Sequence, residues 1–282
     1  MKTVPFIKMH GAGNDFVIVD CRAENLIFSK EDVQEICDRH KGIGCDQFVL
    51  LKHSEVADIK VEFYNGDGSK SGACGNASRC IASLVMMQVE QPMTTLETDS
   101  GILECFATGE YSSNDEELVT VNMGTAKYGW QDIPLAYEAD TLSLEGIWDL
   151  GFGLESLAPS CVSMGNPHAV FFVDDAKAIE LEKYGPALEH HKMFPKRANI
   201  GIAQIISKGE INLRVWERGA GETLACGSGA CAAVAAGLRR KLLSNKVVVH
   251  LPGGDLTIEI IESGEIMMTG PVAVVFTGVI EL

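Results

Sequence analysis

The sequence contains no apolar stretch of 18 or more residues and carries little positive charge. Its 23 lysines and arginines are outnumbered by 39 aspartates and glutamates, so the formal net charge is −16 and the pI is near 4.8. A transmembrane helix needs such an apolar stretch, and a strongly acidic chain is repelled by the phosphates of nucleic acids. We therefore expect neither a membrane nor a nucleic acid as a partner.

An even, regularly spaced set of cysteines is also missing. The nine cysteines are irregularly spaced, unlike the disulfide framework of a short secreted domain. No signal peptide is recognisable, because Met1 to Pro5 lead directly into a strand-like pattern. We expect free thiols and a cytoplasmic location. With 282 residues and a hydrophobic content of 46%, the chain can form one large or two medium domains.

Two cysteines carry the clearest pattern that is present. Cys74 and Cys226 each stand between an alanine and a glycine, and they lie 152 residues apart (226 − 74). The same offset separates two Gly-Asn pairs, at 13–14 and 165–166, and the two carboxamides Gln47 and Asn199. One offset at three separate places indicates a duplicated domain with one thiol per copy. Two pseudo-symmetric copies can offer their thiols to opposite faces of one carbon centre, which is a geometry for moving a proton through it.

Short strand-like stretches alternate with turns, and helical patterns are few. Ser29 followed by Asp32 predicts a capped helix that runs to about His40. The segments that follow the two cysteines predict helices from 74 to about 88 and from 226 to about 243. A strand-rich chain with one prominent helix per half predicts an α+β fold of two domains, each with its sheet wrapped around a helix. The expected strands are 16–19, 48–51, 59–64, 118–122, 169–173, 213–216, 247–251 and 256–261.

The starts of these two helices concentrate the chemistry. A cysteine immediately before a helix faces unpaired backbone N–H groups and the positive end of the helix dipole, which favour the thiolate and lower the pKa of the thiol. The same N–H groups can hold a substrate carboxylate. Each helix start therefore offers both a proton-transfer group and a carboxylate cradle. Four other cysteines are interpreted as buried structural residues: Cys21, Cys37, Cys105 and Cys161.

Three other interpretations of the same residues are weaker. The segment 227–232 resembles a dinucleotide fingerprint, but it follows the polar segment 218–223 where a buried strand should end. Zinc is disfavoured because the cysteine pairs 74/80 and 226/231 lack two-residue ligand spacing and the histidines are scattered. Two facing thiols can oxidise to a disulfide, which we interpret as a liability of the site and not as its purpose.

Motifs dispersed over almost the whole chain resemble those of the diaminopimelate epimerase family. In the first half the resemblance is carried by Gly13-Asn14-Asp15-Phe16, Arg39-His40 through Asp46-Gln47, Asn65, Asp67-Gly68-Ser69 and Cys74-Gly75-Asn76. In the second half it is carried by Met164-Gly165-Asn166-Pro167-His168, Glu217-Arg218-Gly219-Ala220-Gly221-Glu222-Thr223 and Ala225-Cys226-Gly227-Ser228-Gly229.

The resemblance implies an isomerase that interconverts LL- and meso-diaminopimelate by two-thiol proton transfer without pyridoxal phosphate, another cofactor or a metal. It implies two pseudo-symmetric domains, each a strongly curved, mostly antiparallel sheet around a central helix. One domain would comprise residues 1–124 with 271–282 and hold Cys74. The other would comprise 125–270 and hold Cys226. This step would supply lysine and, in many bacteria, the peptidoglycan cross-link.

The resemblance also implies roles for individual residues. Starting from the LL substrate, Cys226 would be the proton acceptor and Cys74 the donor, with His168 and Glu217 tuning or orienting the reacting groups. Arg218 suits a distal carboxylate, because a guanidinium binds carboxylates bidentately. Substrate contacts would fall on Asn14, Gln47, Asn65, Gly75, Asn76, Asn166, Asn199, Glu217, Arg218, Gly227 and Ser228.

The chain departs from the family pattern in three places, and two alternatives stay open. Ala77 stands where the family usually has glycine and is followed by Ser78, while Ala73 is smaller than the usual residue before the first thiol. Phe276 replaces a tyrosine that some members place in a dimer interface; we still expect a homodimer. The alternatives are a proline or hydroxyproline racemase-type enzyme, which would have histidine in place of Asn76, and a thiol-redox protein on the same fold.

Overall fold

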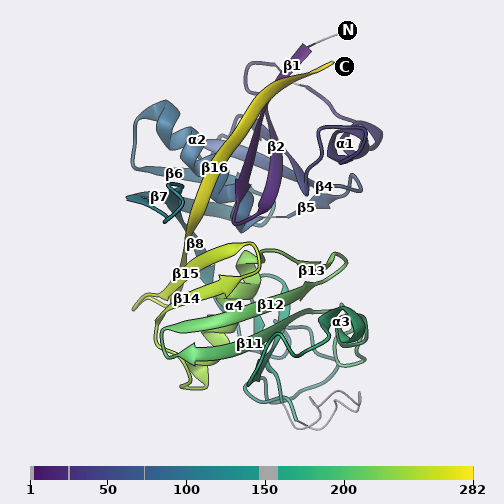
Figure 1. The fold of residues 1–282 in the computed structure, drawn as a ribbon, viewed down its shortest axis with the longest axis vertical. Coiled ribbons are helices and arrows are strands. Elements are labelled where there is room, and N and C mark those ends of the chain that lie inside the picture. The colour runs from purple at the N-terminus through teal and green to yellow at the C-terminus, as the bar shows by residue number, and fades with distance from the viewer. Residues whose placement is uncertain (1–2, 25, 73, 146–157, 282) are drawn as a thin grey trace. The chain divides into compact units, whose positions relative to one another are not determined.

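The computed structural model describes residues 3–24, 26–72, 74–145 and 158–281, and the chain divides into two compact units (Figure 1). The first unit comprises Met1–Asn122 and Thr269–Leu282, and the second comprises Met123–Met268. Each unit is dominated by a sheet and contains two helices in its described part. No helix in the described ranges combines the length and the apolar character needed to cross a bilayer.

The first unit is a sheet that closes on itself. Its strands follow the order β1-β2-β3-β4-β6-β7-β8-β16, and β1 pairs with β16 as well as with β2. Closure leaves β1 and β16 without a free hydrogen-bonding edge along their shared register. The elements are β1 (Thr3–Gly11), β2 (Asn14–Asp20), α1 (Lys30–Cys37), β3 (Gln47–Lys52), β4 (Ile59–Asn65), β5 (Lys70–Ser71), α2 (Gly75–Val89), β6 (Met93–Thr98), β7 (Gly101–Tyr111), β8 (Glu117–Thr125) and β16 (Glu265–Glu281).

Helix α2 is the centre of this unit. Ten of its residues are buried, and it contacts β1, β2, β6 and β7. A helix that is buried on nearly all sides must be enclosed by other elements, because an amphipathic surface helix would keep one polar face in water. The small side chains of Ala77, Ser78 and Ala82 allow the surrounding strands to approach it closely.

The second unit repeats this plan around α4 (Gly227–Arg239). Ten residues of α4 are buried, most of them alanine or glycine, and the helix contacts β9, β10, β11, β12 and β15. The sheet order is β15-β14-β12-β11-β10-β9, with β13 paired to β12. Its remaining elements are β9 (Ser160–Ser163), β10 (Pro167–Val173), α3 (Leu181–Glu189), β11 (Asn199–Ser207), β12 (Glu210–Glu217), β13 (Gly221–Thr223), β14 (Lys246–Leu251) and β15 (Gly254–Ile260).

The two units share their strand register at the offset found in the sequence. Strands β2 and β3 run parallel with Phe16 opposite Gln47, and β10 and β11 run parallel with His168 opposite Asn199. Both members of the second pair lie 152 positions after the members of the first. The predicted α+β fold, with one sheet around one helix in each of two related halves, is confirmed.

The helices following the two cysteines begin where expected, but two predicted helix ends are wrong. The capping box of Ser29 and Asp32 is present, yet α1 ends at Cys37 because Asp38 adopts an extended backbone. Helix α4 ends at Arg239 and not near Leu243, because Lys241 has a left-handed backbone with φ of 62°. The chain turns there and packs the Leu243 side chain on Gly237, where a Cβ would lie only 2.4 Å from Leu243 Cδ1.

Candidate active site

Cys74 and Cys226 occupy the same structural position in the two units. Each is the N-cap of the buried central helix, with an extended backbone, and neither thiol caps the helix itself. The first N–H groups of α2 and α4, which include those of Gly75 and Gly227, therefore lie beside a sulfur atom. These groups have no partner within a helix and favour an anion. Ala73, which precedes the first thiol, lies outside the described residues.

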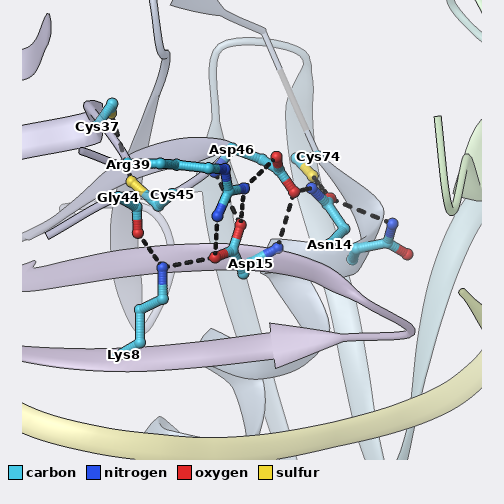
Figure 2. A network of polar contacts seen from close by, with 10 residues as sticks. Lys8, Asn14, Asp15, Cys37, Arg39, Gly44, Cys45, Asp46 and Cys74 are labelled. Atoms are coloured by element: carbon cyan, nitrogen blue, oxygen red, sulfur yellow. Dashed lines mark hydrogen bonds and ion pairs between the residues drawn. The ribbon is translucent and has the colours of Figure 1, made fainter. Parts of the chain in front are cut away.

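Asn14 lies beside the Cys74 thiol (Figure 2). The thiol lies 3.7 Å from Asn14 Oδ1 at the start of β2, and Asn76 Nδ2 donates to the same oxygen at 3.3 Å. The turn before β2 contains Ala12 and Gly13, which both have positive φ. This tight turn brings Asn14 beside the start of α2.

Cys226 has corresponding neighbours. Its sulfur lies 3.7 Å from Ser228 Oγ, and Asn166 Nδ2 donates to that oxygen at 3.3 Å. Asn166 and Ser228 lie 152 positions after Asn14 and Asn76, so a hydrogen bond joins the same two positions in each unit. The structure thus reproduces the sequence repeat at the level of side-chain contacts.

Glu217 controls the electrostatics of Cys226. Complete burial of the thiol, followed by the negative charge of Glu217 and a hydrogen bond to that carboxylate, raises the pKa of Cys226 well above its ordinary value. Contacts with the Gly229 N–H and with Ser228 lower the pKa but do not compensate. The predicted lowering of this pKa is therefore wrong for the protein without substrate. Thr223 donates to Glu217 Oε1 at 2.5 Å and holds the carboxylate in place.

His168 is a neutral, buried residue of β10. Its exposed fraction is 1%, and burial, reinforced by the positive charge of Arg218, lowers its pKa to about 3. Nε2 lies 2.9 Å from Asn166 Oδ1 and 3.4 Å from Asn199 Nδ2. His168 therefore contacts two of the predicted substrate-binding amides and carries no charge near neutral pH.

The loop that carries Arg218 is fixed from two sides. Asn199 Oδ1 accepts a 2.8 Å hydrogen bond from the Arg218 N–H, while its Nδ2 donates to the Pro167 carbonyl. The buried carboxylate of Glu189 accepts from the Gly219 N–H at 3.0 Å. These contacts set the course of the backbone at Arg218. Glu189 belongs to none of the motifs recognised in the sequence.

Gln47 and Asn65 form the corresponding part of the first unit. Gln47 Nε2 donates to Asn65 Oδ1 at 3.0 Å, and Asn65 Nδ2 donates to Ser69. Gln47 Oε1 is buried, and none of the described residues donates a hydrogen bond to it. A buried carbonyl oxygen without a donor is costly, so this atom is ready to accept from a bound cationic group.

Four charged residues of the first unit form a cluster that contacts Asn14, and no role for this cluster was predicted from the sequence. Lys8, Asp15, Arg39 and Asp46 are joined by ion pairs of 2.6 to 2.7 Å (Figure 2). Asp46 Oδ2 accepts from Asn14 Nδ2 at 2.8 Å. The repeat gives no signal for this cluster, because the corresponding positions of the second unit hold Ser160, Pro167, His191 and Ala198.

The other cysteines lie away from the helix starts or within the cores. The four interpreted as structural, Cys21, Cys37, Cys105 and Cys161, are all buried. Burial raises the pKa of Cys105 and of Cys161 to about 12, and it does the same for Cys80. These three thiols are therefore poor nucleophiles and poor bases. Cys37 and Cys45 lie 3.4 Å apart, sulfur to sulfur.

An open pocket of about 370 Å³ in the second unit contains none of the predicted site residues. It lies between Thr125, Tyr128, Ala235 and Arg239, among others. Arg239 stacks over the Tyr128 ring and donates to Thr141 Oγ1, so the charged group is already used in packing. In the described part of the chain, no three His, Cys, Asp or Glu side chains gather in an arrangement that could hold a metal.

Comparisons with known proteins agree with this arrangement. The family model described as Diaminopimelate epimerase matches residues 6–129 and 160–275. Diaminopimelate epimerase of Acidiphilium cryptum is 48% identical over 97% of this chain and 95% of its own length. That of Rhodospirillum centenum is 49% identical over 97% of this chain and 91% of its own length. A crystal structure of a phenazine biosynthesis protein of the PhzF family from Bacillus anthracis shares the fold, with a TM-score of 0.69, 18% identity and complete coverage of both chains.

The family model and these relatives define an isomerase of the epimerase class. Within that class, the chain belongs to the diaminopimelate epimerase family.

Proposed function

We propose that this protein interconverts LL- and meso-2,6-diaminopimelate by moving a proton at one α-carbon with two thiols. The observation that carries the proposal is the equivalence of the two cysteines. Each cysteine is the N-cap residue of the central helix of its unit. Asn14, beside Cys74, is hydrogen-bonded to Asn76, and Ser228, beside Cys226, is hydrogen-bonded to Asn166; the two pairs occupy equivalent positions. The names of the relatives supply the substrate.

The proposed reaction begins at Cys226. The Cys226 thiol is hydrogen-bonded to Glu217, so this carboxylate is the group placed to accept its proton once the substrate is bound. The resulting Cys226 thiolate removes the α-proton from the LL substrate and becomes a thiol again. Cys74 donates its thiol proton to the opposite face of the carbanion, which gives the meso product and a Cys74 thiolate. In the reverse direction the two cysteines exchange roles.

Polar groups of both units would hold the substrate. The first N–H groups of α2 and α4 suit a carboxylate, and Arg218 suits the carboxylate at the other end. Gln47 Oε1 and the Glu217 carboxylate suit the ammonium groups. The proposed binding set is Asn14, Gln47, Asn65, Gly75, Asn76, Asn166, Asn199, Glu217, Arg218, Gly227 and Ser228.

The proposed chemistry consists of proton transfers alone, so no cofactor and no metal enters any step. We propose that the enzyme works in the cytoplasm, in the supply of lysine and of peptidoglycan precursors. We further propose that the chain forms two epimerase domains, residues 1–124 plus 271–282 with Cys74 and residues 125–270 with Cys226. The family match favours this function over a proline racemase-type activity and over a redox role.

A homodimer is part of the proposal. Strand β16 exposes the apolar side chains of Val274, Val275, Phe276 and Val279, each more than 40% exposed. A row of large apolar side chains on one strand suits an interface between proteins. Light scattering coupled to gel filtration tests this point, since a monomer at micromolar concentration would contradict it.

Isotope exchange tests the proposed function. Reduced enzyme is incubated with LL-diaminopimelate in D₂O, and deuterium at the α-carbon of both epimers is measured by mass spectrometry. We expect exchange in the wild type and none in Cys74→Ala or Cys226→Ala, with circular dichroism showing that both variants are folded. No exchange by the reduced wild type would contradict the function. Near-normal turnover of either variant would contradict the roles of the thiols.

A further inference from the structure

The orientation of the Asn14 amide is set by Asp46. Asp46 Oδ2 accepts a 2.8 Å hydrogen bond from the Asn14 side chain. An ionised carboxylate can only accept, so the amide nitrogen must face it and the amide oxygen must face away. On that opposite side, Asn14 Oδ1 meets the Cys74 thiol at 3.7 Å and Asn76 Nδ2 at 3.3 Å (Figure 2).

Asp46 is itself held in place by several contacts. Arg39 Nη2 binds Asp46 Oδ1 at 2.7 Å and Asp15 Oδ1 at 2.7 Å, which ties the two carboxylates together. Each aspartate also accepts from the backbone N–H of the other, at 3.0 and 3.1 Å. Lys8 binds Asp15 Oδ2 at 2.6 Å and donates to the Gly44 carbonyl. The aspartates of the cluster are thus each matched by a cation.

Asp15 stays ionised at neutral pH. Burial works against ionisation of Asp15, but hydrogen bonds from Arg39 and Lys8 hold the pKa of that carboxyl well below its usual range. Because Arg39 binds both carboxylates, it keeps the Asp46 side chain pointed at Asn14. The exposed position of Asp46, at 43% of its side chain, means that its main effect is one of orientation and not of stability.

The second unit arranges the corresponding amide the other way round. Ala198 occupies the position of Asp46, so no carboxylate faces Asn166. There, Asn166 Oδ1 lies 2.9 Å from His168 Nε2, and its Nδ2 points to Ser228, which contacts Cys226. The amide oxygen of Asn14 therefore faces the Cys74 thiol, whereas the amide nitrogen of Asn166 faces the Ser228 hydroxyl beside Cys226.

This difference affects the protonation of Cys74. A carbonyl oxygen accepts from a thiol but repels a thiolate, so hydrogen bonding to it favours the protonated form. We propose that Asp46 is a positioning residue that fixes the Asn14 amide so that its oxygen keeps Cys74 as a thiol, ready to donate a proton. The proposal rests on the proposed function only for the use of that proton. The orientation itself is a property of the free protein.

Thiol alkylation of the free protein tests the proposal without substrate. In Asp46→Asn an amide faces Asn14 and no longer dictates which way the Asn14 amide points. We expect iodoacetamide to modify Cys74 about three to ten times faster at pH 7.5, because less of the thiol is then held in its protonated form. The Cys226 peptide, measured by mass spectrometry in the same sample, should keep its wild-type rate.

A matched control separates orientation from the loss of a surface ion pair. Asp20 also pairs with an arginine, Arg22, and its side chain is 43% exposed, like that of Asp46. It has no contact with Asn14 among the described hydrogen bonds, so Asp20→Asn should leave alkylation of Cys74 and turnover unchanged. Asp46→Glu keeps a carboxylate and should restore a slow alkylation rate at least in part.

Turnover provides the second readout. We expect Asp46→Asn to lower kcat about tenfold or more with a smaller change in KM. The reason is that Cys74 can donate a proton only while it is a thiol. Wild-type alkylation of Cys74 in folded Asp46→Asn would overturn the proposal, and so would equal effects of Asp46→Asn and Asp20→Asn. Faster alkylation together with a wild type that lacks isotope exchange would instead support the orientation and contradict the proposed function.

Discussion

Gly229 lies against Cys226 so closely that any side chain at this position would touch the sulfur. A Cβ on Gly229 would be 3.1 Å from Cys226 Sγ and 3.0 Å from Val215 Cγ2. The corresponding residue of the first unit is Ala77, which is fully buried and already carries that methyl group. The two thiols therefore have different amounts of room beside them.

Gly229→Ala should reduce turnover through Cys226. The added methyl group must push the thiol or Val215 aside by a few tenths of an ångström, and a small displacement of a reacting group can cost about 10²-fold in rate. We expect kcat to fall at least about tenfold, while the midpoint of thermal unfolding stays near that of the wild type because alanine favours helices over glycine. Steady-state kinetics and calorimetry measure both quantities.

Ala77→Gly is the control for this prediction. It removes a methyl group at the equivalent position and leaves Cys226 untouched, so alkylation of Cys226 should not change. Gly229→Ala with wild-type kcat would show that the neighbouring side chains absorb the methyl group without moving the thiol.

Glu217→Gln should make Cys226 more reactive and the enzyme less active. The negative charge of Glu217 and its hydrogen bond raise the pKa of Cys226, so a neutral amide should lower it and speed alkylation at pH 8. Turnover should fall about 10²-fold, because the group that takes the Cys226 proton is lost. Alkylation is followed on the Cys226 peptide by mass spectrometry.

Glu222→Gln is a suitable comparison for this experiment. Glu222 is a nearby carboxylate on β13 that pairs with Arg214 at 2.7 Å, and it is not among the groups that shift the pKa of Cys226. We expect no change in the alkylation rate. Equal rates in Glu217→Gln and the wild type would refute control of the thiol by Glu217.

His168 makes the stability of the protein depend on pH in a defined window. Its pKa is lowered to about 3 in the folded protein, against about 6.5 in an unfolded chain. Between these values the unfolded state binds a proton that the folded state does not, so the free energy of unfolding falls as the pH falls from about 6.5 towards 3. The slope contributed by this one residue is up to about 1.4 kcal/mol per pH unit.

His168→Gln should remove this contribution. The free energy of unfolding is measured with urea at pH 4.5, 5.5, 6.5 and 7.5. In His168→Gln it should fall less steeply towards acid pH than in the wild type, because unfolding takes up about one proton fewer. The carboxylates titrate in both proteins and cancel in the difference. Parallel curves for the two proteins would mean that His168 takes up its proton over the same pH range in the folded and unfolded states.

The duplication alone predicts the site residues that it repeats. Asn14, Gln47 and Cys74 have counterparts at one offset because the parallel register of β2 on β3 recurs in β10 on β11. Asp46 could not be recognised in this way, since its counterpart is Ala198 and its partner Asn14 lies 32 residues away. Because the charged cluster occurs in the first unit alone, it does not recur at the 152-residue offset.

Local reasoning also failed where tertiary packing dominates. The N–H groups at the start of α4 do lie beside Cys226, but burial and Glu217 raise the pKa of this thiol where a lowered pKa was expected. Helix α3 was missed because its sequence contains Gly185 and Pro186, which disfavour helices in isolation. In the fold, α3 packs against β12 and β13, and this packing outweighs the poor propensity.

Gly185 shows how that packing selects an unfavourable residue. A Cβ at Gly185 would lie 2.3 Å from Cδ2 of the Trp216 indole ring. The Nε1 of this ring donates a 2.8 Å hydrogen bond to buried Glu189. Gly185→Ala should therefore destabilise the protein by about 1–3 kcal/mol through overpacking, although alanine is the better helix former. Chemical denaturation followed by tryptophan fluorescence measures the change.

Gly209→Ala is the matched control, because a Cβ there meets only the Lys246 carbonyl oxygen at 3.8 Å, an ordinary contact. Its free energy of unfolding should stay within about 0.5 kcal/mol of the wild type. Since Glu189 also binds the Gly219 N–H, a displaced Trp216 should move the loop of Arg218 and raise KM in Gly185→Ala but not in Gly209→Ala. Unchanged stability and KM in Gly185→Ala would mean that α3 can shift away from Trp216 without cost, and the packing argument for this helix would fail.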